Sequence, residues 1–92
     1  MNYLEKLAAT IRSDVGDSGG DDLGVFVLYA LVARAKGSSA TAEDVHDAWV
    51  AWKTLRGEDR SMREFTDLTA DERALDEPFA AAIRRASAGA RR

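Results

Sequence analysis

The apolar run Val25-Phe-Val-Leu-Tyr-Ala-Leu-Val-Ala33 decides the fold of this 92-residue chain. Its β-branched and aromatic residues would also suit a strand. Its length, and the Ala, Arg and Lys residues that follow it, instead favour a helix from Asp22, as its cap, to Lys36, with Gly37 ending it. The run is too short to span a membrane, which needs about 20 apolar residues. A helix that is apolar on nearly every side must be buried. We therefore expect the central helix of a small bundle.

Capping-box patterns predict where three further helices begin, over residues 3–14, 42–56 and 70–88. Their paired residues are Asn2 and Glu5, Thr41 and Asp44, and Thr69 and Glu72. In each pattern a short polar side chain is followed three residues later by an acidic one. Gly57 ends the middle helix.

Pro78 interrupts the last of these segments, since an interior proline costs a helix about 3 kcal/mol. Either Asp76 caps a new helix that has Pro78 in its first turn, or the helix kinks there. A short helical turn is also expected from residues 61–64, beside Phe65. The prediction is an all-α, single-domain bundle of four to five helices over residues 1–88, with a frayed basic tail at 89–92.

Apolar residues recur at helical spacing on each predicted helix and define its buried face. The three faces are Leu4, Leu7, Ala8, Ile11 and Val15; Val45, Ala48, Trp49, Trp52 and Leu55; and Phe79, Ala82, Ile83 and Ala86. We expect Trp49 in the core. Trp52 lies near Lys53 and Arg56, so it could instead be a ligand-stacking wall or an interface anchor.

The net charge of −3 conceals a strong segregation: −1 over residues 1–37, −6 over 38–77 and +4 over 78–92. An acidic chain is a poor partner for nucleic acid, whose phosphates are neutralised by Lys and Arg. Acidic residues also fill the start of the 42–56 helix, where a helix-turn-helix would meet DNA. We expect no nucleic-acid partner, and neither the apolar runs nor the N-terminal residues suggest a membrane segment or a signal peptide.

No set of residues predicts catalysis or metal binding. The sequence has no cysteine, and its serine-protease-like string Gly16-Asp-Ser-Gly-Gly20 lacks a histidine before it and a β-barrel context. Its aspartates also lack the spacing of a calcium loop. His46 is the single histidine, one position off the apolar face, and is expected to be a half-exposed helix residue. We expect a protein that is not an enzyme and has no cofactor.

Two segments resemble the ryanodine-receptor (RyR) domain. They are Val45-His-Asp-Ala-Trp-Val-Ala-Trp-Lys53, and Phe65-Thr-Asp-Leu-Thr-Ala-Asp-Glu-Arg73 with Asp76. The aromatic-glycine turn and the His-Pro step of that domain are absent. The resemblance implies a module that binds or sequesters a nucleotide-derived molecule. Its candidate binding residues here are His46, Trp52, Lys53, Arg56 and Phe65.

A longer set of residues resembles small uncharacterised proteins of actinobacteria and their phages. It comprises Lys36-Gly37, Ala42-Glu-Asp-Val-His-Asp-Ala-Trp49, and Asp76-Glu-Pro-Phe79 followed by Ala82-Ile-Arg84. Ten Arg against three Lys, with 17 Ala, fit a GC-rich genome. We expect a cytoplasmic accessory protein whose interaction module binds a host protein and could form a homodimer. The alternative is the small-molecule binder implied by the RyR resemblance.

Overall fold

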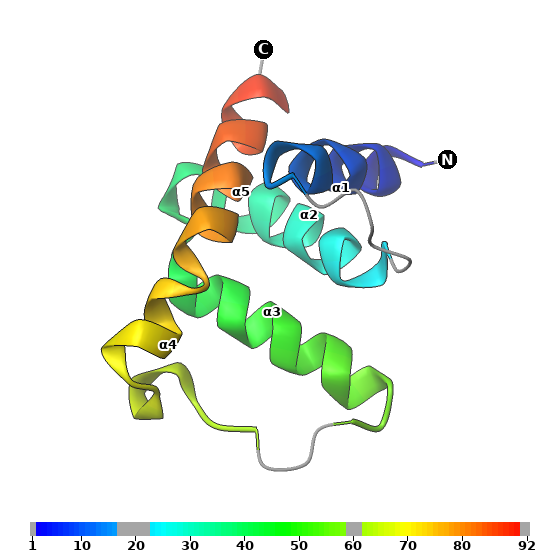
Figure 1. The fold of residues 1–92 in the computed structure, drawn as a ribbon. Coiled ribbons are helices and arrows are strands. Elements are labelled where there is room, and N and C mark those ends of the chain that lie inside the picture. The colour runs from blue at the N-terminus through cyan, green and yellow to red at the C-terminus, as the bar shows by residue number, and fades with distance from the viewer. Residues whose placement is uncertain (1, 17–22, 59–61, 91–92) are drawn as a thin grey trace.

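A computed structural model describes residues 2–16, 23–58 and 62–90 (Figure 1). Within these ranges the structure contains helices and turns and no strand, which confirms the all-α fold. The five α-helices are α1 Tyr3–Asp14, α2 Gly24–Lys36, α3 Ala42–Leu55, α4 Ala70–Ala74 and α5 Glu77–Ala90. Two 3-10 turns, η1 Gly37–Ser39 and η2 Phe65–Asp67, lie before α3 and before α4.

The helix starts follow the local chemistry of the sequence. Both hydrogen bonds of the capping box are present at α1, α3 and α4, so all three expected boxes are confirmed. At α3 the backbone N–H of Asp44 donates to Thr41 Oγ1 over 3.3 Å, and the N–H of Thr41 donates back to Asp44 Oδ2 over 2.9 Å. α2 begins at Gly24 behind Leu23, while Asp22 lies outside the described residues.

Pro78 is the second residue of α5, and α4 ends four residues earlier at Ala74. The backbone N–H of Ala80 donates to the carbonyl of Asp76 over 3.1 Å, which closes the first turn of the new helix. The first turn of a helix needs no N–H from proline, so the alternative of a fresh helix is confirmed. α5 continues to Ala90, beyond the expected boundary at 88, and residues 91–92 lie outside the described ranges.

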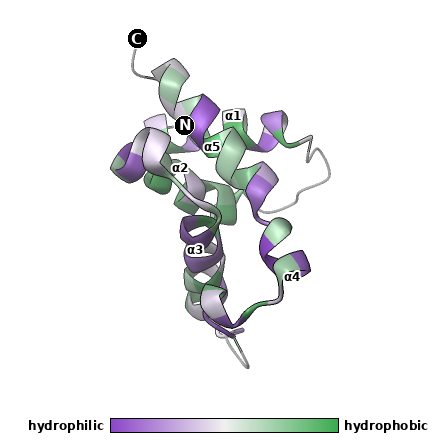
Figure 2. Cartoon of the chain, turned by 90° about the vertical axis from the view of Figure 1, so that its left-hand side faces the viewer, coloured by the Kyte–Doolittle hydropathy of each residue, from purple (hydrophilic) through white to green (hydrophobic). Residues whose placement is uncertain are grey.

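α2 occupies the centre of the bundle, as its apolar sequence predicts. α1 lies beside α2, α5 packs against both, and α3 lies on the other side of α2 (Figure 1). The largest fully buried side chains are Ile11, Val45 and Ile83, which come from three different helices around α2. α3 and α4 each mix hydrophobic and hydrophilic residues along their length (Figure 2). No described helix is long and apolar enough to cross a membrane.

The buried face of α3 differs from the predicted one. His46, expected to be half-exposed, is only 6% exposed, whereas Leu55 is 80% exposed. Trp49 is half-buried and does not join the core. The helical spacing is correct, but the segment from Met62 to Asp76 covers the His46 side of the helix, and nothing in the described chain covers Leu55.

Candidate functional site

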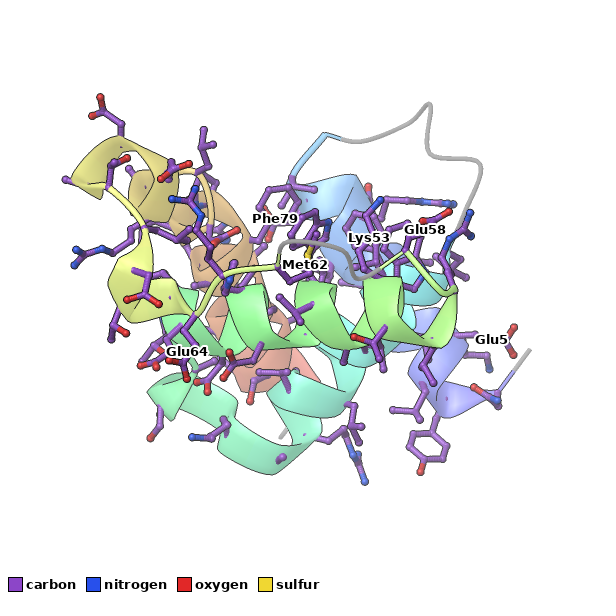
Figure 3. All side chains as sticks on the ribbon, turned by 90° about the horizontal axis from the view of Figure 1, so that it is seen from below. Glu5, Lys53, Glu58, Met62, Glu64 and Phe79 are labelled. Atoms are coloured by element: carbon purple, nitrogen blue, oxygen red, sulfur yellow. The ribbon has the colours of Figure 1, made fainter. Side chains whose placement is uncertain are left out.

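A cavity of about 440 Å³ lies between α3, the segment that returns past it, and the start of α5. Its lining residues are Tyr29, His46, Trp49, Met62, Arg63, Leu68, Glu72, Leu75, Asp76 and Phe79. They come from α2, α3, the stretches just before and just after η2, and the α4–α5 region. In Figure 3, Met62 and Phe79 lie on the same side of α3. Aromatic and aliphatic side chains form most of the wall, and the polar side chains of His46, Arg63, Glu72 and Asp76 interrupt it.

The His46 imidazole lies at the polar side of this cavity. Its Nε2 is 2.6 Å from the backbone carbonyl oxygen of Arg63. Since a carbonyl oxygen can only accept, the Nε2–H must donate, which fixes the tautomer of the neutral ring. Its Nδ1 is 3.8 Å from Asp76 Oδ2. His46 therefore ties α3 to the returning segment and turns its second nitrogen toward the residue before α5.

Aromatic rings surround His46 and continue to the floor of the cavity. The His46 ring centroid is 6.0 Å from that of Trp49 and 6.0 Å from that of Phe65. On the floor, Tyr29 and Phe79 pack at 5.8 Å between centroids. Rings at these separations are in the range of favourable aromatic packing. The cavity thus offers flat, polarisable walls beside a small polar edge.

The charges at the polar edge do not all compensate each other. Arg63 Nη2 is 2.6 Å from Glu72 Oε2, so these two groups form an ion pair. Hydrogen bonds from the Thr69 backbone and from Arg63 hold the pKa of Glu72 below its usual value. Partial burial raises the pKa of Asp76, and the neighbouring His46 opposes this shift.

The Asp76 carboxylate also acts on the floor of the cavity. The pKa of the Tyr29 hydroxyl is raised, first by burial and then by the negative charge of Asp76. Among the described residues no hydrogen bond to the Asp76 side chain is present, and the His46 ring is its only partner within ion-pair distance, with no lysine or arginine there. The site therefore holds one carboxylate without a cation of its own.

The five binding residues expected from the sequence fall into two places. His46 lines the cavity, and the Phe65 ring packs against the His46 ring. Trp52, Lys53 and Arg56 lie further along α3, where they form a separate cluster with Glu58 that we call the α3-end cluster. Lys53 Nζ is 5.4 Å and Arg56 Cζ is 4.8 Å from the centroid of the Trp52 ring.

Glu58 pairs with both cations of the α3-end cluster. Its Oε1 is 3.4 Å from Lys53 Nζ and 3.1 Å from Arg56 Nε, and Lys53 and Glu58 point toward each other in Figure 3. These hydrogen bonds, that of Arg56 first, lower the pKa of Glu58. Trp49 connects the two places, since Lys53 Nζ is also 5.7 Å from its ring centroid.

A comparison with protein families classifies the chain. The family described as "Domain of unknown function (DUF7701)" matches residues 2–88. The chain belongs to this family. No curated protein and no solved structure matches it. The matched range of this DUF7701 domain includes every residue of the cavity and of the α3-end cluster. Over its described residues, no group of three or more His, Asp or Glu side chains could hold a metal ion.

Sequence reasoning missed most of the cavity of this DUF7701 domain. It interpreted Asp76 as a helix cap, Phe79 as a core residue and Tyr29 as part of the central helix. Tyr29 and Phe79 do belong to helices and Asp76 directly precedes α5, but the Asp76 side chain accepts no hydrogen bond among the described residues, so it does not cap the helix. The missing information is the path of the segment after Gly57, which brings Met62 and Arg63 back against α3. The one feature of the sequence that could have pointed to the cavity was Asp76, because it is an acidic residue next to positions that supply buried side chains.

Proposed function

We propose that this DUF7701 domain is a binding module without chemistry of its own and that the cavity beside α3 is its binding site. The observation that carries the proposal is the cavity itself. Its volume of about 440 Å³ is in the range of ligand pockets, about 300–1,000 Å³. Its walls are largely apolar, with a few polar groups at one edge, as is typical of such pockets.

A protein partner is the occupant that the rim favours. Leu75 lines the cavity and is 72% exposed, beside the half-buried rings of Trp49 and Phe79. An apolar side chain of a partner could enter between these rings and cover Leu75 at the same time. Such aromatic pockets, closed off from water by the partner, supply most of the affinity in protein interfaces.

The two tryptophans provide a direct test, because Trp49 lines the cavity and Trp52 belongs to the α3-end cluster. In the Trp52→Phe variant, Trp49 is the single indole. We expect a saturable change in its fluorescence when phenethyl alcohol, a neutral aromatic probe, is titrated in. The Trp49→Phe variant, which keeps only Trp52, is the matched control and should not respond. Equal responses from both variants, or none from Trp52→Phe, would contradict the proposed site.

A nucleotide-derived ligand at the α3-end cluster is the second candidate. It is supported by the Trp52 ring, which a base could stack on, with the cations Lys53 and Arg56 beside it. Glu58 opposes it, because a phosphate would have to displace this carboxylate from both cations. Titration of adenosine monophosphate into the Trp49→Phe variant tests this candidate: quenching of Trp52 would favour it over the cavity.

We further propose that the domain comes from an actinobacterium or one of its phages and acts in the cytoplasm. The support is the composition, with ten Arg, three Lys and 17 Ala, together with the absence of cysteine. Identifying the genes that flank the coding sequence would test this origin. Neighbours of a kind foreign to such genomes would count against it.

A further inference from the structure

We propose that the group bound in the cavity is an organic ammonium ion, held between His46 Nδ1 and the Asp76 carboxylate and flanked by aromatic rings. This inference rests on the proposed function and adds the chemical class of the ligand. It depends on three independent observations: the direction of the His46 hydrogen bond, the charges at the polar edge, and the nature of the walls.

The first observation is a mismatch between two acceptors. Because Nε2 of His46 donates to the Arg63 carbonyl, Nδ1 of the neutral ring carries a lone pair. This lone pair faces Asp76 Oδ2 at 3.8 Å, a distance too long for a hydrogen bond. An ammonium nitrogen could approach both atoms at about 2.8 Å and donate to each. A ligand with a cationic donor therefore satisfies two groups that do not satisfy each other.

The second observation is the charge of the lining. Arg63 and Glu72 neutralise each other at 2.6 Å, which leaves Asp76 as the uncompensated charge among the described lining residues. An anionic ligand would meet the two carboxylates of Glu72 and Asp76, and the one arginine of the cavity, Arg63, is already paired with Glu72. A cationic ligand would meet the Asp76 carboxylate, which pairs with no lysine or arginine side chain among the described residues.

The third observation concerns the walls, since Tyr29, Trp49 and Phe79 line the same cavity as Asp76. Aromatic faces attract organic cations through their quadrupoles, and they also pack against the apolar part of a ligand. A bare metal ion would gain little from such walls. An ammonium group carried on an apolar body uses both the walls and the carboxylate.

Three probes of similar size and different charge test the inference on the Trp52→Phe variant near neutral pH. They are phenethylammonium, neutral phenethyl alcohol and anionic hydrocinnamate. We expect phenethylammonium to bind at least about ten-fold more tightly than the alcohol, and hydrocinnamate to bind most weakly. Asp76→Asn should remove the preference for the cation. Asp67→Asn, which removes a carboxylate of η2 that does not line the cavity, should leave it unchanged.

The outcomes separate this inference from the proposed function. If phenethylammonium and phenethyl alcohol bind equally, or if Asp76→Asn keeps the preference, the ammonium site is wrong and the binding function stands. If no probe binds, both fail. If Asp76→Asn does not fold, the site can be tested on the unmutated domain by nuclear magnetic resonance of the His46 ring. Binding of phenethylammonium should then shift the Nδ1 resonance of His46, and an unmoved resonance would overturn the site.

A competition experiment distinguishes a cationic side chain of a polypeptide from a free amine. Butylammonium and a capped Ala-Lys-Ala peptide carry the same ammonium group, and each is added to the complex with phenethylammonium. Stronger displacement by the peptide assigns the ammonium to a lysine side chain, and stronger displacement by butylammonium assigns it to a small amine. Failure of both to displace phenethylammonium would contradict the inference.

Discussion

At the scale of single residues, the His46 imidazole joins three parts of the chain. It belongs to α3, it binds the backbone at Arg63, and it faces Asp76 at the start of α5. The contact with Arg63 spans 17 positions in the sequence. A side chain in this position fixes how the returning segment lies against the helix, and with it the shape of the cavity.

We predict that His46→Ala lowers the free energy of unfolding by about 2–4 kcal/mol. The change empties the space of a buried ring and leaves the Arg63 carbonyl without its donor. Urea denaturation would measure the loss. Asp47→Ala is the matched control, because Asp47 is the exposed neighbour on the same helix, and its effect should stay within about 0.5 kcal/mol. Similar losses in both variants would show that His46 has no special structural role.

The burial of His46 could not be predicted from the sequence. Its position beside the apolar stripe predicts a half-exposed residue, as long as nothing is known of the segment that covers it. The same holds for Trp49, which was expected in the core and lines the cavity instead. Helical spacing tells which residues share a face, but a long-range contact decides which part of that face is covered.

At the scale of the helices, local chemistry determined most of what could be predicted. A capping box links residues three positions apart, so its hydrogen bonds can be inferred from the sequence alone, and all three expected boxes form. The cavity needs residues between Tyr29 and Phe79 to converge. No periodicity records such a convergence, which is why the helices were predicted and the site was not.

The position of Pro78 in α5 leads to a prediction for two proline changes. Ala81→Pro places a ring in the interior of α5, where it removes a backbone hydrogen bond, and should lower the free energy of unfolding by about 3 kcal/mol or more. Pro78→Ala should change it by about 1 kcal/mol or less, because the first turn tolerates either residue. Thermal unfolding followed by circular dichroism would compare them. A larger loss from Pro78→Ala would contradict the placement of the helix start.

At the scale of the whole molecule, the segregated charges of the sequence meet in specific pairs. Arg85 binds Asp14 of α1 through two hydrogen bonds of 2.9 and 2.7 Å. Arg84 binds Glu77 over 2.7 Å and the carbonyl of Ala40 over 2.8 Å. Arg85 therefore joins α5 to the first helix, while Arg84 pairs with the first residue of its own helix and binds the backbone just before α3. Self-association, expected from the size of the core, stays a prediction that light scattering would test.

We predict that the domain loses stability as the pH falls below about 4.5. The pKa values of Asp14, Glu58 and Glu72 are lowered in the folded chain, Asp14 chiefly by its hydrogen bond with Arg85. A carboxyl group whose pKa is lower in the folded than in the unfolded chain stabilises the fold at pH values above its unfolded-state pKa. This stabilisation is lost as the pH falls through its folded-state pKa. Asp76, whose pKa is raised, acts in the opposite direction but is a single group.

Urea midpoints at about pH 6 and about pH 3 would measure this loss. Arg85→Gln removes the partner of Asp14 and should make the difference between the two midpoints smaller. Arg84→Gln removes the same charge at the next position and should not alter the contribution of Asp14. Equal midpoints at the two pH values would show that these carboxylates do not govern the stability of the fold.

The pair of Arg85 and Asp14 also bears on how the domain is made. It joins residues 71 positions apart, and α5 contributes Ile83 to the interior that α1 and α2 begin. During synthesis the first two helices leave the ribosome several seconds before α5, at roughly 5–20 residues per second. In that interval their apolar faces lie open to water and to other chains. Until α5 has been made, the interior that α1 and α2 begin lacks Ile83, and a chaperone that shields apolar surface could bind these open faces.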